Sequence, residues 1–217
     1  MIKAVIFDMD GLLIDSEPLW QEAEMNEFIK VGVPISKERV KETMGMRIDM
    51  VVEYWFSRYP WKNPSKKVVE KNIVGNVIEL IKTKGESMIG VKEIVDSFTK
   101  EKMPIAIASS SSMEIIKTVL DKILIEKYIK IICSAENELF GKPHPGVYLT
   151  AANKLSVKTE DCLVFEDTIN GLIAAKAARM KCVAVPNEFN KNDKRFRIAD
   201  MVITSLKDFH LEHLKNL

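Results

Sequence analysis

The sequence is poor in the residues that form disulfides or metal-binding cysteine clusters. It has three cysteines, Cys133, Cys162 and Cys182, which lie far apart and include no CxxC spacing. Each of them lies in or beside an apolar run, so we expect three reduced, buried thiols. Unpaired cysteines are typical of proteins in a reducing compartment, which predicts a cytoplasmic location.

The sequence also lacks an excess of charge of one sign and any long apolar run. Its 32 basic and 31 acidic residues leave a formal net charge of +1. This balance provides no electrostatic footprint for nucleic acid or for an anionic membrane. No apolar run approaches the length of a transmembrane helix, and the opening MIKAVIF does not resemble a signal peptide. We therefore expect neither a nucleic acid nor a membrane as a partner.

What the sequence does contain is a regular alternation of short apolar runs with amphipathic stretches. Strands are predicted at residues 2–7, 105–108, 129–133, 162–165, 182–185 and 201–203. Helices are predicted between them at residues 91–100, 113–121, 146–155 and 169–178. The strands are apolar at consecutive positions, as strands buried on both faces are. This order predicts an α/β fold with a Rossmann-like parallel sheet and helices on both faces.

One region, residues 16–84, interrupts the alternation. It has no convincing strand, and helices are predicted at 17–31, 37–44, 50–59 and 65–84, with Ser16 and Ser65 as N-caps. We expect a helical cap domain at 16–84, inserted after the first strand of a catalytic core formed by 1–15 and 85–217. Because active sites of parallel sheets lie beyond the carboxyl ends of the strands, this cap is expected to act as a lid.

Reactive side chains follow four of the predicted strands. In chain order they are the pair Asp8 and Asp10, the serine run that begins with Ser109 and Ser110, Lys142 in the loop after the third strand, and the pair Glu166 and Asp167. Carboxylates at this density need a cation, and an all-oxygen set of ligands suits Mg²⁺. The serine run opens a helix, and the free N–H groups of a helix N-terminus bind anions. Carboxylates, an anion site and a lysine together predict phosphoryl transfer, with an aspartyl-phosphate as intermediate.

Each motif has a simpler structural interpretation when it stands alone. The serine run can cap a helix, Lys142 can be a surface lysine, and Glu166 with Asp167 can cap the helix that follows. A phospho-receiver signalling module is a different functional alternative, since it also gathers acids, a hydroxyl and a lysine at strand ends. Its acidic pair is adjacent, however, its acceptor aspartate lies on a mid-chain strand, and it has no helical insertion of this size.

The stretches FDMDGLLIDSE, GKPHPGVY and FEDTINGLIAAKAA, with Ser109 between the first two, resemble the haloacid dehalogenase superfamily along the whole chain. The helical insertion after the first motif is similar to that of the β-phosphoglucomutase-like subfamily. Within it, DGLLIDSEPLW and MGMRIDMVVEYW most resemble the bacterial 2-deoxyglucose-6-phosphatase or hexitol phosphatase group. The resemblance implies a Mg²⁺-dependent phosphatase of small sugar phosphates, such as hexose or hexitol 6-phosphates and 2-deoxyglucose 6-phosphate.

The resemblance also implies roles for the four acidic residues. Asp8 would attack phosphorus and bind Mg²⁺. Asp10 would protonate the leaving sugar oxygen, then accept a proton from the attacking water, and its carbonyl oxygen would bind the metal. Asp167 would be a metal ligand, and Glu166 would either bind the metal or support a residue that does.

Other matching residues are expected to bind the substrate. Ser109 and the N–H of Ser110 would hold phosphoryl oxygens, and Lys142 would neutralise their charge. Trp20 and Arg47 are expected to contact the sugar from the cap. The subfamily's mutases carry a histidine where this chain has Trp20, which favours hydrolysis over the alternative function, a sugar-phosphate mutase. A monomer is expected, because the lid of such an enzyme must move.

Overall fold

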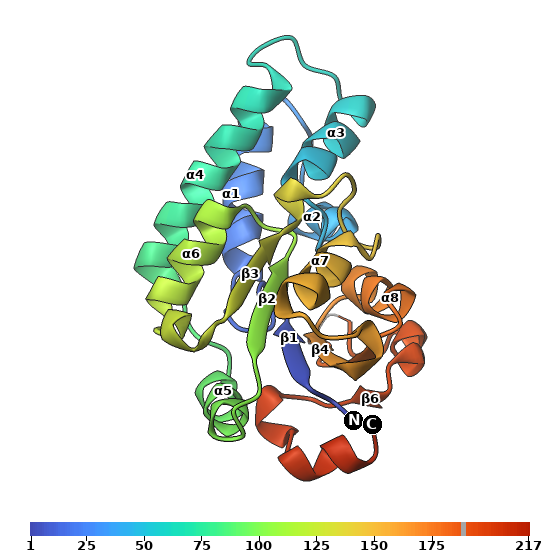
Figure 1. Ribbon diagram of the computed structural model, residues 1–217. Coiled ribbons are helices and arrows are strands. Elements are labelled where there is room, and N and C mark those ends of the chain that lie inside the picture. The colour runs from blue at the N-terminus through green and yellow to red at the C-terminus, as the bar shows by residue number, and fades with distance from the viewer. Residues whose placement is uncertain (188–189) are drawn as a thin grey trace.

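A six-stranded parallel sheet forms the centre of the computed structural model, which describes residues 1–187 and 190–217 (Figure 1). The strands are β1 (Ala4–Phe7), β2 (Ile105–Ser109), β3 (Ile131–Ser134), β4 (Cys162–Glu166), β5 (Lys181–Ala184) and β6 (Met201–Val202). Their spatial order is β3-β2-β1-β4-β5-β6, and all the neighbouring strands pair in parallel. This is the order of a doubly wound sheet, so the predicted Rossmann-like α/β fold is confirmed.

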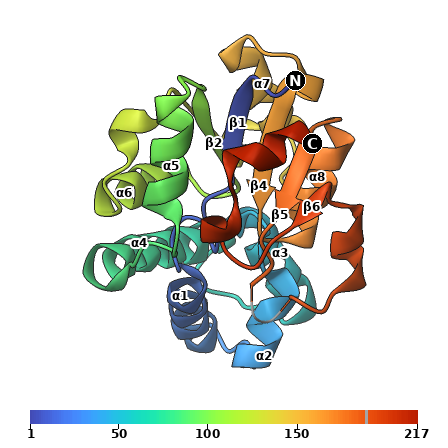
Figure 2. The ribbon, with the colours of Figure 1, turned by 90° about the horizontal axis from the view of Figure 1, so that it is seen from below.

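The two faces of the sheet carry side chains of different size. Because side chains alternate between the faces of a strand, Phe7 and Phe165 lie on one face while Ala106 and Ala108 lie on the other. The large residues pack against α5 (Val91–Lys100) and α6 (Met113–Lys122), and the small ones pack against α7 (Gly146–Leu155) and α8 (Ile169–Ala177). Figure 2 shows these two helix pairs on opposite sides of the sheet.

The three cysteines are buried free thiols, as predicted, and they lie on the face of the sheet that carries the small side chains.

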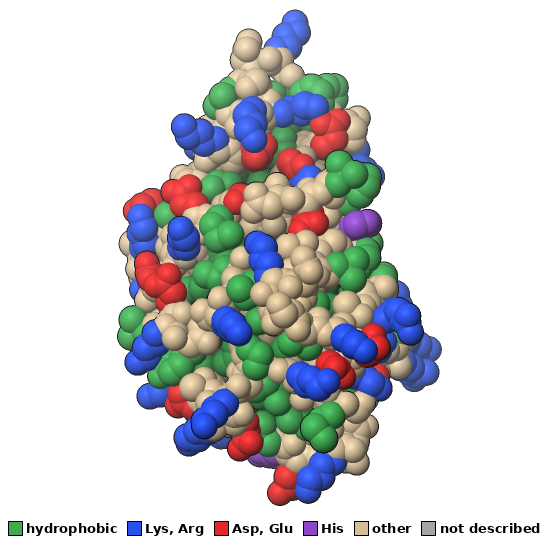
Figure 3. All heavy atoms as spheres, viewed as in Figure 1, with side chains coloured by type: hydrophobic (Ala, Val, Ile, Leu, Met, Phe, Trp, Pro, Cys, Tyr) green, Lys and Arg blue, Asp and Glu red, His purple; other side chains and the backbone are tan. Residues whose placement is uncertain are grey.

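At the surface, basic and acidic side chains are interspersed on the face that Figure 3 shows, in keeping with the near-zero net charge. Among the described residues, none of the helices combines the length and the apolar character needed to cross a membrane.

Four helices follow β1 directly and lie beyond the carboxyl ends of the strands (Figure 1). They are α1 (Glu17–Lys30), α2 (Lys37–Val40), α3 (Ile48–Arg58) and α4 (Lys66–Lys84). Where one helix was predicted at 37–44, the structure has the shorter helix α2 followed by a 3₁₀ turn at Lys41–Thr43. Phe28, Trp55 and Ile73 of this helical region belong to the same apolar cluster as the large-residue face of the sheet. The division into a core and a cap domain at residues 16–84, and the movement of this cap as a lid, stay predictions.

The remaining turns of helix are short and lie in the connections of the core or after β6. They are 3₁₀ turns at Glu126–Tyr128, Ala135–Asn137, Thr159–Asp161, Lys194–Ile198, Leu206–Asp208 and Leu211–Lys215.

Ser16 and Ser65 occupy the N-cap positions of α1 and α4, but neither side chain makes a capping hydrogen bond. The predicted N-cap positions are therefore confirmed, but the capping hydrogen bonds expected of these side chains are absent. The hydroxyl of Ser16 instead donates to Asp10 Oδ1 at 2.7 Å. A residue expected to stabilise a helix end thus links the helical region to the acidic loop after β1.

The two connections between the sheet and the helical region run side by side. The N–H of Asp15 donates to the carbonyl oxygen of Glu86 at 2.9 Å, and the N–H of Met88 donates to that of Leu13 at 3.0 Å. This backbone pairing ties the start of α1 to the chain that leaves α4. It places the first turns of α1 directly beside Asp10.

Candidate active site

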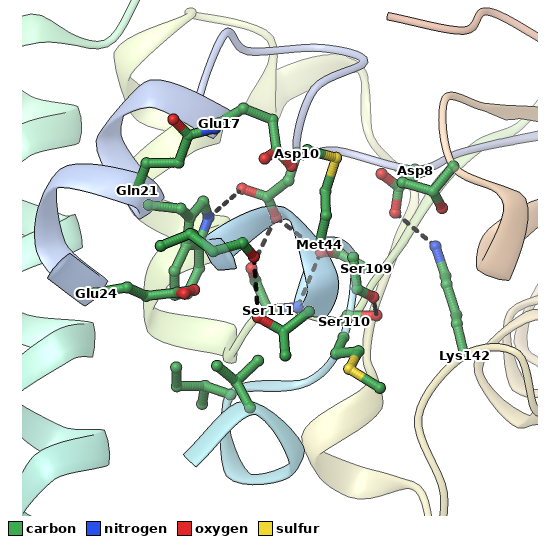
Figure 4. A pocket seen from close by; sticks show the side chains of 18 of the residues that line it. Asp8, Asp10, Glu17, Gln21, Glu24, Met44, Ser109, Ser110, Ser111 and Lys142 are labelled. Carbon is green, nitrogen blue, oxygen red and sulfur yellow. Dashed lines mark hydrogen bonds and ion pairs between the residues drawn. The ribbon is translucent and has the colours of Figure 1, made fainter. Parts of the chain in front are cut away.

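The four strand-end motifs meet at one pocket between the sheet and α1. Figure 4 shows labelled residues of the first three motifs around it. Of the residues predicted to form the site, the pocket is lined by Asp8, Asp10, Trp20, Ser109, Ser110, Lys142 and Glu166. Asp167 is buried beside them, and Arg47 is not among the lining residues. The parallel topology brings these side chains together because the carboxyl ends of β1, β2 and β4 lie at the same edge of the sheet.

Lys142 is a buried cation that joins two carboxylates. Its Nζ donates to Asp8 Oδ1 at 2.5 Å, to Glu166 Oε1 at 2.7 Å and to the carbonyl oxygen of Ala108 at 3.0 Å. Burial by itself would lower the pKa of Lys142, but Asp8 and Glu166 raise that pKa above its usual value. With a side chain only 2% exposed, Lys142 is not the surface lysine of the simpler interpretation.

Both carboxylate oxygens of Glu166 are already occupied by hydrogen-bond donors. Oε1 accepts from Lys142 and from the hydroxyl of Tyr148, the latter at 2.8 Å, while Oε2 accepts from the N–H and the hydroxyl of Thr168, both at 3.0 Å. Thr168 also caps α8, where its hydroxyl accepts from the N–H of Gly171. The helix cap is thus Thr168, and Glu166 holds Lys142 in place.

Asp167 shows the opposite pattern, since both its oxygens are buried and have no hydrogen-bond partner among the described residues. Burial, followed by the nearby Glu166 and Asp8, raises the pKa of Asp167 well above its usual value. Burial also raises the pKa of Asp8, although Lys142 opposes the shift. One oxygen each of Asp8, Glu166 and Asp167 lies within 4.8 Å of the others. Unpartnered buried carboxylate oxygens are costly unless a cation accompanies them, so this donor set fits Mg²⁺.

Two glycines make this close arrangement of carboxylates sterically feasible. Gly11 has a φ of +75°, and a Cβ at this position would lie 2.4 Å from Asp167 Oδ2. A Cβ at Gly171 would lie 1.6 Å from Glu166 Oε1. Any larger residue at either position would displace a carboxylate of the site.

Asp10 is held from both sides of the pocket. Its Oδ1 accepts from the Ser16 hydroxyl at 2.7 Å and from Trp20 Nε1 at 2.9 Å, both on the helical side. Its Oδ2 accepts from the hydroxyl of Ser111 at 2.7 Å and from that of Ser109 at 3.4 Å, in the loop after β2. Asp8 faces a lysine while Asp10 faces hydroxyls and an indole, and such a difference in surroundings suits two carboxyl groups with different tasks.

The serine run divides its side chains between the pocket and the helix that follows. Ser112 caps α6 by accepting from the N–H of Ile115, which is the simpler interpretation of the run. The hydroxyl of Ser109 accepts from the N–H of Ser111 at 3.0 Å, and the hydroxyl of Ser110 donates to the carbonyl oxygen of Gly45 at 3.3 Å. Only part of the run therefore faces Asp10.

Arg47 does not contact the pocket, contrary to the expectation that it binds substrate. Its Nη1 donates to the carbonyl oxygens of Ala135 and Glu138, both at 2.8 Å, and its Nε and Nη2 pair with Asp49. The guanidinium fastens the start of α3 to the loop after β3. Arg47 therefore does not belong to the residues that line the pocket in this structure.

Sequence reasoning missed two acidic residues of α1 that line the pocket, Glu17 and Glu24. Burial, Asp10 and Asp15 raise the pKa of Glu17 to about 7. Burial and then Glu17 raise the pKa of Glu24 to about 8. Their spacing of seven residues, two helical turns, was the available signal, because it places both on one face of α1.

The chain resembles proteins named as phosphatases along most of its length. Residues 5–185 match the family of haloacid dehalogenase-like hydrolases. The chain is 40% identical over 214 residues to hexitol phosphatase B of Escherichia coli K12, covering 98% of this chain and 96% of that protein. It is 31% identical over 182 residues to the phosphorylated carbohydrates phosphatase of Thermotoga maritima, covering 82% of each.

Among solved structures, the β-phosphoglucomutase of Clostridium difficile superposes with a TM-score of 0.85 at 24% sequence identity. The superposition covers 99% of this chain and 96% of that chain, and it shows a shared fold. These matches leave no support for a phospho-receiver module and confirm the prediction of a phosphatase. The chain therefore belongs to the haloacid dehalogenase-like hydrolase family.

Proposed function

We propose that this protein is a Mg²⁺-dependent phosphatase of small sugar or sugar-alcohol monophosphates. The observation that carries the proposal is the grouping of the pocket residues Asp8 and Lys142 with the unpartnered Asp167 buried beside them. The names of the two phosphatase relatives, which concern hexitols and phosphorylated carbohydrates, support the class of substrate. A cytoplasmic location and a monomeric state stay predictions.

In the proposed reaction the carboxylate of Asp8 attacks phosphorus, and the bond between phosphorus and the sugar oxygen breaks. Asp10, in its protonated form, gives its proton to the leaving oxygen. Ser109 and Ser110 hold the phosphoryl oxygens in line for attack. Asp10 then accepts a proton from the water that hydrolyses the aspartyl-phosphate, which releases phosphate and restores Asp8.

Asp8, Asp167 and the carbonyl oxygen of Asp10 would hold the Mg²⁺ ion. When bound, the ion would neutralise charge on the phosphoryl group and on the carboxylates around it. Glu166 was expected either to bind the metal or to support a residue that does, and its oxygens are occupied by Lys142, Tyr148 and Thr168. We propose that Glu166 supports the site by fixing the ammonium group of Lys142 against Asp8.

A phosphate-release assay over a panel of sugar phosphates tests this function. With Mg²⁺ we expect release from hexose and hexitol 6-phosphates, complete loss of release in excess EDTA, and recovery when Mg²⁺ is restored. Full activity after exhaustive treatment with the chelator would contradict the metal requirement. Hydrolysis of p-nitrophenyl phosphate without hydrolysis of any sugar phosphate would contradict the proposed substrate class.

Substitution of Trp20 by phenylalanine tests the positioning of Asp10. The change removes the indole donor that lies 2.9 Å from Asp10 Oδ1, and we expect kcat to fall about tenfold, the effect of one hydrogen bond. Trp61→Phe is the matched control, because its Nε1 donates to the carbonyl oxygen of Pro64, and Trp61 does not line the pocket. Equal kcat values in the two variants would contradict the role of Trp20.

The mutase alternative is not favoured. Its assay follows the conversion of a sugar 1-phosphate into the 6-phosphate, and we expect free phosphate to be the product instead. Turnover to an isomeric sugar phosphate without phosphate release would revive the alternative.

A further inference from the structure

We propose that Glu24 binds a hydroxyl group at the uncharged end of the substrate, so that the pocket selects monophosphates of polyols and sugars over substrates with a second anionic group. This inference rests on the proposed function and deepens it. It assigns recognition of the sugar to one face of α1, and to one carboxyl group on that face.

The position of Glu24 suits recognition at a distance from the phosphate. Glu17, Trp20, Gln21 and Glu24 all line the pocket, and their spacing of three, four and seven residues places them on one face of α1. Figure 4 shows Glu17, Gln21 and Glu24 along one wall, with the carboxyl group of Glu24 directed into the pocket. Trp20 contacts Asp10, and Glu24 lies one turn farther along the helix, about 6 Å at 1.5 Å per residue.

The hydrogen bonding of Glu24 indicates that it is not a structural residue. Its side chain is buried, and Oε2 has no hydrogen-bond partner among the described residues. Glu27, on the same helix and also buried, accepts hydrogen bonds from Asn72 at 2.6 Å and from Lys30 at 3.0 Å. Buried polar groups without partners are rare in folded proteins, and one that lines a pocket is available to a ligand.

The chemistry of the carboxyl group matches a hydroxyl. Since the pKa of Glu24 is raised to about 8, the group is mostly protonated at neutral pH and offers a donor as well as acceptors. A hydroxyl group also donates and accepts, so the two groups are complementary.

A second anionic group in the substrate would meet unfavourable surroundings in this part of the pocket. It would lie near Glu17 and Glu24, whereas Lys142 is already bound by Asp8 and Glu166. Lys41, the other cation among the described lining residues, is solvent-exposed, and an exposed cation attracts an anionic group only weakly. Burial of a charge without an opposite charge beside it is strongly unfavourable.

The test measures kcat/KM for sorbitol 6-phosphate, 6-phosphogluconate and p-nitrophenyl phosphate. The first two are open-chain compounds of equal length that differ at the carbon remote from the phosphate, which is a hydroxymethyl group in one and a carboxylate in the other. We expect the wild-type protein to prefer sorbitol 6-phosphate by at least about tenfold. In Glu24→Leu the ratio of kcat/KM for sorbitol 6-phosphate to that for p-nitrophenyl phosphate should fall about tenfold, through KM.

Two further variants make the result specific. Glu24→Gln keeps a donor and an acceptor, so it should retain most of the preference for sorbitol 6-phosphate. Glu27→Gln makes the same chemical change on the same helix outside the pocket and should behave like the wild type. Thermal unfolding should show Glu24→Leu to be at least as stable as the wild type, because the change removes an unpartnered buried polar group.

The possible failures are distinguishable. An unchanged substrate ratio in Glu24→Leu, or equal use of 6-phosphogluconate by the wild type, overturns the inference while sugar-phosphate hydrolysis stands. A lower unfolding temperature for Glu24→Leu than for the wild type indicates a structural role and also overturns it. A wild-type protein that hydrolyses p-nitrophenyl phosphate alone overturns the proposed function, and the inference with it.

Discussion

Replacement of Asp8 by asparagine is expected to lower kcat for phosphate release by about a thousandfold or more. The amide cannot attack phosphorus, so the aspartyl-phosphate does not form. The shape of the side chain is retained, and its oxygen can still accept a hydrogen bond from Lys142. Steady-state phosphate release, with thermal unfolding measured on the same samples, checks both expectations.

Burial makes a large loss of stability in Asp8→Asn unexpected. Burial among other carboxylates raises the pKa of Asp8, and the change removes one acidic group from this cluster. Asp161→Asn is a suitable control, because Asp161 pairs with Lys3 at the surface and should leave kcat unchanged. Substantial activity of a correctly folded Asp8→Asn protein would refute the assignment of the nucleophile.

Replacement of Lys142 by methionine is expected to abolish activity and to lower the free energy of unfolding by about 3–5 kcal/mol. The change removes the cation from a site where it is 2% exposed and leaves Asp8 and Glu166 without it. Breaking a buried ion pair on one side leaves an uncompensated buried charge, which accounts for the size of the effect. Urea unfolding of the wild type and of Lys142→Met, both in the absence of metal, measures this difference in the free energy of unfolding.

A second lysine provides the control for this measurement. Lys181 pairs with Asp200 at 3.0 Å, and its side chain is 41% exposed. Because exposed ion pairs contribute little, Lys181→Met should cost less than about 1 kcal/mol. A loss of similar size in both variants would show that the burial of Lys142 does not have the energetic consequence assigned to it.

The positions of the strands and of the main reactive residues followed from local sequence. The apolar runs that end at Asp8, Ser109 and Glu166 predicted strands buried on both faces, and β1, β2 and β4 lie where those runs lie. Parallel strands present their carboxyl ends at one edge, so residues that directly follow the strands had to converge. Lys142 was recognisable only through its motif, because a lysine in a loop carries no positional signal by itself.

The partners of side chains on the helical region did not follow from local sequence. Ser16 has the features of an N-cap residue, yet its hydroxyl donates to Asp10, and Arg47 binds the carbonyl oxygens of Ala135 and Glu138. The sequence predicted a helix at 17–31, but a helical pattern does not tell a core position from a pocket wall, so Glu24 was missed.

By itself, then, the sequence determined an α/β phosphatase with its acidic pair at the end of β1. The apolar pattern of the strands and the identity of the residues that follow them are both local properties of the chain. The tertiary structure alone decided which acidic residue has carboxylate oxygens without hydrogen-bond donors. Glu166 and Asp167 are adjacent, but one is saturated by Lys142 and other donors while the other has no partner among the described residues. Thr168, which saturates one oxygen of Glu166, is a near neighbour in sequence, but Lys142 and Tyr148, which saturate the other, are not. Only the packing of the sheet and its helices brings those two side chains within hydrogen-bond distance.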